Sequence, residues 1–358
     1  MSKDKTKPLM TRREALGAMA TGIGAAITHA GEPQRRFLTC GVVLYPWDLS
    51  LTDWPERAHK AGITAIGLHA ARRLDVLVDF VKSDQGRHFL HACQRLGINI
   101  EYEVHALGTF LSREYFAGPD KDMFRMDSTG QRNPDYNCCP SSQRALDIIA
   151  EKAVEYGGLL KPTTNRYFFW PDDAREWCSC PKCKGLTSSD QSTLVENTMA
   201  IALQKHVRPG AAVSHIAYGP TLNPPGNVPP HKDLFLEFAP IARVYDHPID
   251  DPDVQLGGAA PEPESQAGYL DILDANLAVF PCETAQVLEY WLDVSRYSGW
   301  KQPVVKLPWL ADVVRADGRA YARRGIRHVT TFATWIDADY VKQFGHPPLK
   351  EYVNALNG

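Results

Sequence analysis

The feature that most constrains this chain is an alternation of short β-rich apolar runs with longer amphipathic stretches, from residue 37 onward. Strands that alternate with helices form parallel βα units, and eight such units close into a barrel. We therefore predict an α/β fold, a (β/α)8 TIM barrel with extended βα loops and a cysteine-rich loop after the fourth strand. The expected strands are 38–45, 63–69, 98–105, 166–171, 212–218, 235–245, 286–291 and 329–335. The expected helices are 54–61, 74–96, 142–159, 192–206, 266–277 and 308–324.

The sixth and seventh units are the least regular part of this pattern. Residues 246–264 are rich in Asp, Pro and Gly, and residues 303–307 have the composition of an additional strand. A doubly wound open sheet is the alternative fold, but no Gly-rich phosphate loop follows a predicted strand.

The charge balance argues against two classes of partner. The chain has 39 Lys and Arg against 42 Asp and Glu, which gives a formal net charge of -3. Binding to nucleic acid or to anionic lipid depends on an excess of positive charge. We therefore expect no nucleic-acid partner.

Residues 1–30 have the layout of an export signal. Lysines and the pair Arg12 and Arg13 precede a short, weakly apolar run that ends at Ala30. The arginine pair resembles a twin-arginine signal, although Ala15 stands where Phe is usual. The run is too short to span a membrane, and no other run is long enough. We predict a signal peptide over 1–30, a barrel domain over 31–358 and a periplasmic or extracellular location. A frayed amphipathic helix is the alternative for 1–30.

Polar and aromatic residues gather at the predicted carboxyl ends of the strands, where barrels of this class carry their active sites. Sugar rings pack their apolar faces on aromatic side chains, while carboxylates and imidazoles bind the hydroxyl groups. We therefore expect a carbohydrate substrate. The predicted substrate-binding residues are Tyr45, Trp47, His69, Glu103, His105, Trp170, Tyr218, Tyr245, His247, Trp291, Trp335 and Asp337.

The catalytic candidates are three carboxylates, Asp172, Asp173 and Glu289. Asp172 and Asp173 directly follow the fourth strand, and a like charge nearby raises the pKa of one member of such a pair, which suits a general acid. Neighbours in an extended segment point to opposite sides, so only one can face the substrate, and we predict that it is Asp173. Alternatively, the pair caps the next helix or loop. We expect Glu103, both aspartates and Glu289 to converge on one cleft.

The cysteines predict a metal site. Cys178, Cys180 and Cys183 lie within six residues, and Cys138 and Cys139 lie in the preceding loop. Three thiolates and one of that pair complete the tetrahedral set that structural zinc prefers. We predict a structural zinc bound by Cys139, Cys178, Cys180 and Cys183, with Cys138 as the alternative to Cys139 and no organic cofactor. Two disulfides are the competing arrangement in an oxidising compartment.

Several strings resemble a bacterial family, domain of unknown function 4838, from about Phe37 to the C-terminus. They are GLHA at 67–70, EYEVHAL at 101–107, CPSS at 139–142, WPDD at 170–173 leading into CSCPKC at 178–183, and LEYWLD at 288–293. The resemblance implies a secreted, glycoside-hydrolase-like (β/α)8 barrel, distantly similar to α-glucuronidases and hexosaminidases.

Two catalytic assignments follow from wider resemblances. The Asp pair resembles that of hexosaminidases that use the substrate's acetamido group as nucleophile, which implies that Asp172 orients the acetamido nitrogen and Asp173 is the general acid. An acid after the fourth strand and a Glu at the seventh resembles the largest clan of barrel glycosidases, which implies that Glu289 is the nucleophile or base. Both assignments stay open at this point.

The predicted function is a secreted glycoside hydrolase that cleaves a glycosidic bond in an oligosaccharide or polysaccharide fragment. One alternative is a catalytically silent barrel that binds carbohydrate through Trp47, Trp170, Trp291 and Trp335. Another is a structural metal protein whose rim acids satisfy helix ends. The fold by itself does not choose among these functions.

Overall fold

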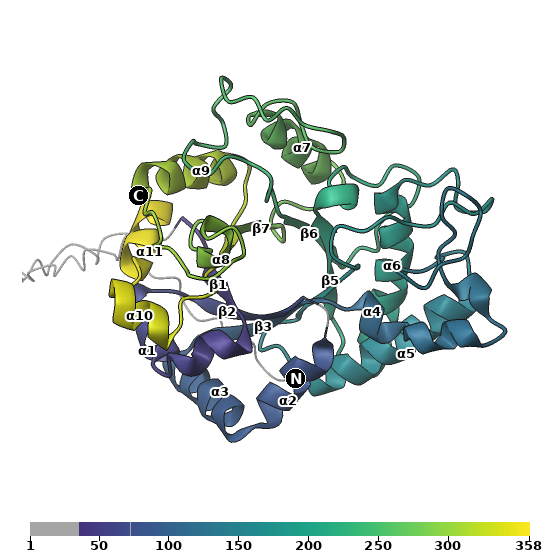
Figure 1. Cartoon of the computed structure of the whole chain (residues 1–358), viewed down its shortest axis with the longest axis horizontal. Helices are drawn as coiled ribbons and strands as arrows, with labels where there is room; N and C mark the ends of the chain where they lie inside the picture. Colours follow the sequence, from purple (N-terminus) through teal and green to yellow (C-terminus); the bar gives the residue numbers. More distant parts are fainter. Residues whose placement is uncertain (1–35, 72) are drawn as a thin grey trace, which may run out of the picture. The chain divides into compact units, whose positions relative to one another are not determined.

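The computed structural model describes residues 36–71 and 73–358. Eight parallel strands pair in chain order and β8 pairs with β1, so the sheet is a closed barrel (Figure 1). The predicted (β/α)8 fold is confirmed. The predicted signal peptide lies outside the described residues and stays a prediction. The strands are β1 (Thr39–Leu44), β2 (Ala65–Ala70), β3 (Asn99–His105), β4 (Arg166–Trp170), β5 (Ala212–Ala217), β6 (Leu234–Phe238), β7 (Gln286–Glu289) and β8 (His328–Phe332).

Helices surround the strands (Figure 1). The stretch expected as one helix over 74–96 is two helices, because Ser83 starts a new one and its hydroxyl accepts a hydrogen bond from the Gly86 amide. The two C-terminal helices α10 and α11 were not expected. The helices are α1 (Trp54–Ala61), α2 (Leu74–Lys82), α3 (Asp84–Leu96), α4 (Leu107–Phe110), α5 (Gln143–Leu159), α6 (Ser188–His206), α7 (Gly268–Leu277), α8 (Val294–Tyr297), α9 (Ala311–Arg323), α10 (Ala338–Phe344) and α11 (Leu349–Asn357).

The sixth unit departs most from the expected pattern. β6 ends at Phe238, seven residues before the predicted end, and Pro240 soon follows, which has no N–H for a strand ladder. The chain then runs through a long loop, residues 239–267, before α7. Gln266 closes this loop by donating to the carbonyl oxygens of His247 (2.9 Å) and Pro248 (2.6 Å). Residues 303–307 do not form a strand.

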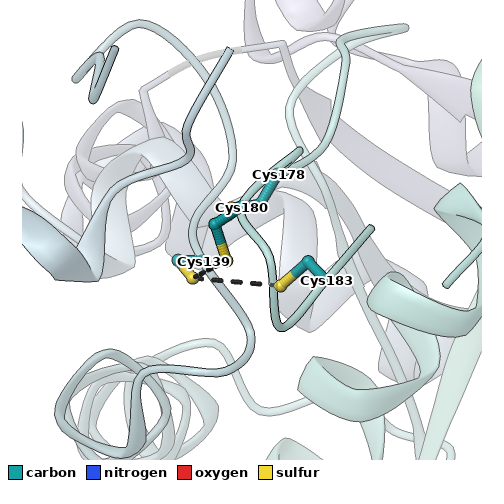
Figure 2. A group of neighbouring side chains, drawn as sticks. All are labelled: Cys139, Cys178, Cys180 and Cys183. Atoms are coloured by element: carbon teal, nitrogen blue, oxygen red, sulfur yellow. Dashed lines mark hydrogen bonds between the residues drawn. The ribbon is translucent and has the colours of Figure 1, made fainter. Parts of the chain in front are cut away.

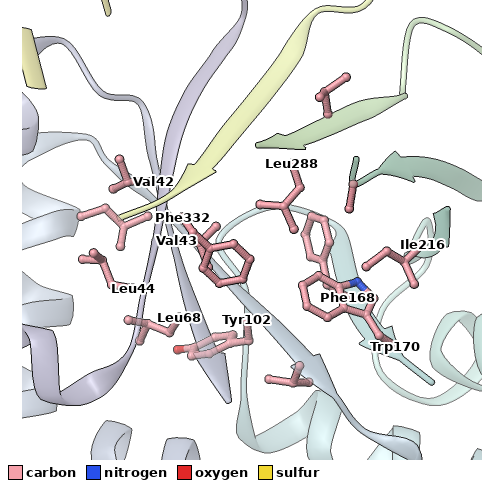
Figure 3. Packing of buried hydrophobic residues seen from close by; sticks show 14 of the residues in the cluster. Val42, Val43, Leu44, Leu68, Tyr102, Phe168, Trp170, Ile216, Leu288 and Phe332 are labelled. Atoms are coloured by element: carbon pink, nitrogen blue, oxygen red, sulfur yellow. The ribbon is translucent and has the colours of Figure 1, made fainter. Parts of the chain in front are cut away.

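The barrel interior is partly apolar and partly ionisable. Figure 3 shows Trp170, Leu288 and Phe332 among the buried side chains of β4, β7 and β8. Glu103 and Glu237 are also fully buried. Glu237 accepts hydrogen bonds from Trp170 Nε1 (2.7 Å) and Gln286 Nε2 (3.2 Å), and burial raises its pKa to about 8.

Gly67 on β2 makes room for this buried acid. A Cβ at that position would lie 2.4 Å from Glu103 Oε1, so a larger residue would collide with the carboxylate. Burial raises the pKa of Glu103 well above its ordinary value, and the nearby Glu237 adds to that shift. The centre of the barrel is therefore built around carboxyl groups that favour the protonated form.

Within the described residues, no helix combines the length and the apolar character that crossing a membrane requires.

Candidate active site

An inner cavity of about 130 Å³ opens among the carboxyl ends of the strands. It is lined by residues of strand ends and of the loops that follow them. Six of the predicted site residues are present: Tyr45, His69, His105, Trp170, Asp173 and Tyr218. The other lining residues are Ala71, Ile216, Ile241, Leu288, Tyr290, Asp293, Ser295, Trp300, Phe332 and Thr334.

Two imidazoles from β2 and β3 line this cavity in fixed orientations. His69 Nδ1 lies 2.6 Å from the Glu103 carbonyl oxygen, and His105 Nδ1 lies 2.6 Å from that of Pro171. A carbonyl oxygen only accepts hydrogen bonds, so each Nδ1 carries the hydrogen. Burial lowers the pKa of His69 to about 3, with a contribution from His105. His69 is therefore neutral near pH 7, and its Nε2 can accept a hydrogen bond from a hydroxyl group.

Asp173 is the more accessible of the two carboxylates in the inner cavity. Its side chain is 42% exposed, and its Oδ1 accepts a hydrogen bond from the Tyr218 hydroxyl at 3.0 Å. The same oxygen lies 3.8 Å from His105 Nε2. Asp173 thus stands at the cavity with partners that orient one oxygen and leave the carboxyl group open to a ligand.

Asp293 is the second carboxylate of the inner cavity and was not among the predicted site residues. Its Oδ1 accepts hydrogen bonds from Ser295 Oγ, Thr334 Oγ1 and the Arg296 amide. Burial raises the pKa of Asp293, while these three donors oppose the shift. The Oδ1 atom of Asp293 is therefore held in place by protein donors at the edge of the cavity.

Asp172 points away from the inner cavity. Its Oδ1 accepts from the Gly108 amide (3.0 Å), and its Oδ2 accepts from the Asn137 amide (2.6 Å) and from Arg113. Gly108 is needed here because a Cβ would lie 2.9 Å from Asp172 Oδ1. Both oxygens are thus occupied by protein donors, and the expectation that Asp172 orients the substrate does not match this geometry. Its contacts join the end of β4 to the loop before α5.

Glu289 lies on the outer side of the barrel wall, and its predicted convergence with Asp173 is wrong. Leu288 and Tyr290 line the cavity, so the residue between them points the opposite way. Glu289 is fully buried, 3.2 Å from Arg243 Nη1, and accepts a hydrogen bond from the Tyr321 hydroxyl of α9. Burial raises its pKa to about 7. These contacts indicate that Glu289 has a structural role.

Trp291 and Glu103 are also absent from the cavity lining. Trp291 has the same outward parity as Glu289, and its Nε1 donates to Asp317 Oδ2 at 3.0 Å. Glu103 faces the barrel interior but lies two residues before His105 on β3, so it sits below the cavity. The predictions that these two residues bind substrate are not supported by the geometry.

Tyr245 and His247 are displaced because β6 ends early. Tyr245 is buried, with the guanidinium carbons of Arg243 and Arg296 4.7 and 4.0 Å from its ring centre. His247 is exposed and lies 3.0 Å from Asp251. Neither residue lines the inner cavity.

Three further predicted residues lie near the barrel rim but outside the cavity lining. Trp47 is 53% exposed and stacks on Tyr45 with ring centres 4.1 Å apart. The Trp335 amide donates to Asp48, and Trp335 has a φ of 64°. Asp337 caps α10 by accepting a hydrogen bond from the Tyr340 amide.

The cysteine cluster is the group of Cys139, Cys178, Cys180 and Cys183, shown in Figure 2. Their four sulfurs lie within 4.8 Å of one another, and Cys139 Sγ is 3.7 Å from Cys180 Sγ and 3.9 Å from Cys183 Sγ. Zinc–sulfur bonds of about 2.3 Å in a tetrahedron place sulfurs about 3.8 Å apart, whereas a disulfide needs about 2.05 Å. The described cysteines form no disulfide. The four thiols could therefore bind a metal, and Cys139 rather than Cys138 completes the set.

Donors around the cysteine cluster suit thiolate ligands. The Met126 amide donates to Cys178 Sγ at 3.3 Å, Arg132 lies 3.7 Å from the same sulfur, and Ser141 Oγ is 3.1 Å from Cys139 Sγ. Hydrogen bonds of this kind orient ligands and stabilise their negative charge. Asn137 extends the link, because its side chain donates to the carbonyl oxygens of Arg175 and Glu176. The cluster therefore joins the loop before α5 to the loop after β4, which carries Asp173.

The fold is a closed (β/α)8 barrel with a cavity at the carboxyl ends of its strands. The family described as Domain of unknown function (DUF4838) matches residues 78–256, half of the chain, and this protein belongs to that family. No curated protein matches the chain.

Two solved structures share the fold. A β-N-acetylhexosaminidase from Bacteroides fragilis NCTC 9343 aligns with a TM-score of 0.52 at 11% identity, over 90% of this chain and 66% of that chain. This protein thus spans slightly less than two thirds of that neighbour. Dispersin B aligns with a TM-score of 0.51 at 12% identity, over 89% of this chain and 99% of that chain. At such identities the likeness establishes the architecture alone.

Proposed function

We propose that this protein is an exported glycoside hydrolase in which Asp173 is the general acid and Asp293 is the second catalytic carboxylate. The observation that carries the proposal is that these two carboxylates of different accessibility line one cavity with aromatic rings at the strand ends. Cleavage of a glycosidic bond needs a proton donor for the leaving oxygen and a second carboxylate. The second carboxylate stabilises the oxocarbenium-like centre, attacks it directly, or activates the water that attacks it. The two structural neighbours with matching folds, a hexosaminidase among them, support the enzyme class.

The roles follow from position. Asp173 is exposed at the cavity, where a leaving group would enter and depart, and it is the acid expected from the sequence. Asp293 is buried, and the three donors on its Oδ1 favour the ionised carboxylate that the second role requires. This assignment replaces Glu289 and gives Asp172 no chemical role.

The charge of the inner cavity favours a neutral sugar. None of the described residues that line it is Lys or Arg, whereas Asp293 lines it as the carboxylate that the proposed mechanism keeps ionised. A uronate held roughly 6 Å from one aspartate would be disfavoured by about 3 kcal/mol at an effective dielectric constant of about 20. Between the two types implied by the resemblance, a hexosaminidase-like enzyme therefore fits the cavity better than a glucuronidase-like one. Tyr and Trp side chains supply the packing surface for the sugar ring.

We also propose that the cysteine cluster binds one structural zinc. Four thiolates leave no coordination position for a substrate, so the metal would fix the loops around Asp173 and take no part in the chemistry. A twin-arginine signal over 1–30 would suit a metal site of this kind, because that route exports proteins that are already folded.

The test is turnover of neutral aryl glycosides and natural glycans by the wild type, Asp173→Asn and Asp293→Asn. Loss of the proton donor costs on the order of 10² to 10⁴ in rate on natural glycans and less when the leaving group is an activated phenol. Asp293→Asn should impair both substrates. Asp246→Asn is the matched control, because Asp246 is exposed and outside the cavity. Equal impairment of Asp173→Asn on both substrates would contradict the general-acid assignment, and sugar binding without any turnover would favour the silent binding barrel.

A further inference from the structure

A second, outer cavity adjoins the first. It has a volume of about 210 Å³ and shares Ala71 and Asp173 with the inner cavity. Its remaining walls come from the connection between β3 and α5 and from Asp172 and Arg175 in the segment after β4. A ligand that extends from the inner to the outer cavity therefore passes Asp173, which is where a scissile bond would have to lie if Asp173 is the acid.

The outer cavity contains a guanidinium, that of Arg175, with no ion-pair partner among the described residues. Arg113 is paired with Asp172, whereas no described carboxylate lies within ion-pair distance of Arg175. The guanidinium carbon of Arg175 lies 4.4 Å from the ring centre of Tyr136, so the aromatic ring positions the cation without neutralising it.

The other charges of this cavity are balanced. Asp135 lines it but is held by Arg125 through two hydrogen bonds, and Asp172 is held by Arg113. Glu176 approaches Arg125 at 3.7 Å, but its side chain is 73% exposed and does not line the cavity. A general acid carries its proton when substrate binds, so Asp173 would add no negative charge at that stage.

We propose that the outer cavity binds the leaving group of the substrate and that Arg175 selects leaving groups with a carboxylate substituent. The proposal rests on the proposed function, because it takes Asp173 as the point of cleavage. Arginine presents a planar fork of donors that matches a carboxylate, and this one is only partly buried and free to receive it. The substrate would thus be a neutral sugar linked to an acidic sugar or an acidic amino-acid residue. The inner cavity would accept a neutral sugar, and the outer cavity would accept a negatively charged leaving group.

The experiment compares the binding of two S-linked thioglycosides that cannot be hydrolysed easily. The probes are 3-carboxyphenyl and 3-carbamoylphenyl 1-thioglycosides of glucose, mannose and N-acetylglucosamine, which differ only in the charge of the leaving group. Dissociation constants are measured by calorimetry for the wild type, Arg175→Gln, Arg175→Lys and the control Arg315→Gln, which alters a half-buried arginine on α9 that lines neither cavity.

For the wild type we expect the carboxylate probe to bind about tenfold more tightly than the amide probe. Arg175→Gln should abolish this preference, Arg175→Lys should retain part of it, and Arg315→Gln should leave it unchanged. Equal binding of the two probes, no binding of any carboxylate probe, or a preference that survives Arg175→Gln would overturn the proposal. A preference that depends on Arg175, in a protein that hydrolyses no O-glycoside, would support the anion site and reject the proposed hydrolase.

Discussion

The ends of β4 and β7 each carry two acidic residues, of which one faces the inner cavity and the other does not. The two acids are adjacent in the chain after β4, whereas they are four residues apart at β7. After β4, the adjacent Asp172 and Asp173 point to opposite sides, one into a network of protein donors and the other into the inner cavity. At β7, Glu289 lies outside the wall and Asp293, four residues later, lines the cavity. The comparison shows that the side of the wall, more than the residue type, decides which acid can meet a substrate.

The most direct test of whether the side of the barrel wall decides the role of an acid is to neutralise Asp293 and Glu289 separately. Asp293→Asn should lower turnover on the order of 10² to 10⁴ with little change in stability. Glu289→Gln should do the reverse, because it weakens the charge balance around the buried Arg243, and loss of one partner of a buried pair costs about 3 kcal/mol. Turnover of an activated aryl glycoside and urea unfolding measure the two effects. If Glu289→Gln abolished turnover at unchanged stability, the assignment of sides would be wrong.

The end of β4 can be tested through the cysteines that flank it. Cys139→Ser should reduce zinc from one per chain to nearly none, because it removes one of four ligands. Cys138→Ser is a matched control at the next position, since Cys138 is buried but outside the cluster. Elemental analysis of protein purified in folded form gives the result. Equal zinc in both variants, or two mapped disulfides in the wild type, would remove the metal site.

A smaller effect concerns the acidity of Asp293. Its hydrogen bond from Thr334 stabilises the carboxylate, so Thr334→Val should raise the pKa of Asp293 further. If the ionised form is the active one, the acid limb of the pH–rate profile should move upward by about one pH unit, which is what the loss of a hydrogen bond to a charged group implies. Thr334→Ser keeps the hydroxyl and should leave the limb in place. An unchanged limb in Thr334→Val would show that another group controls it.

The last expected effect lies beneath the cavity, at Glu237, and concerns stability alone. Its folded-state pKa of about 8 is above the ordinary value of 4.5, so the folded state holds this proton more tightly. The resulting stability is complete below about pH 4.5 and is lost as the pH rises toward 8. Glu237→Gln should therefore flatten the decline of the free energy of unfolding between pH 5 and 8, while Glu151→Gln, on the surface of α5, should not. The slope will not vanish, because Glu103 shifts in the same direction.

The barrel and the β4 end could be predicted because local sequence determines them. The alternation of strands and helices gives the topology, and an apolar strand that runs directly into Asp172 and Asp173 places both acids at its carboxyl end. The three closely spaced cysteines likewise predict their own cluster, since chain proximity brings them together. The sequence did not decide whether Cys138 or Cys139 joins the cluster. That depends on which of these two adjacent side chains faces the other three cysteines.

The β7 end could not be predicted in the same way. A strand of a parallel barrel is buried on both faces, and each parity of 286–291 holds one polar residue, Gln286 or Glu289, among apolar ones, so neither parity is marked as inward. Selecting Glu289 and Trp291 by residue type therefore chose the wrong face, and Tyr290 and Asp293 were missed although both lie in the string LEYWLD. Trp300 was missed because it comes from a loop after α8. For Tyr245 and His247, the error lay in extending β6 past Pro240.

The loop of residues 239–267 between β6 and α7 bears on how the protein can be engineered. Its base is fixed from several sides: Arg243 donates to Asp317 at 2.6 Å, the Ile249 amide donates to the same carboxylate at 2.6 Å, and Gln266 closes the far end. Beyond that base, residues 250–264 reach outward and are mostly exposed or half-buried. A peptide tag or a protease recognition sequence inserted at 257–260 should therefore be tolerated, because the ties that secure the loop to α9 lie outside the inserted stretch. The same insertion at 243–249 would cut through those ties and separate the loop from the barrel it covers.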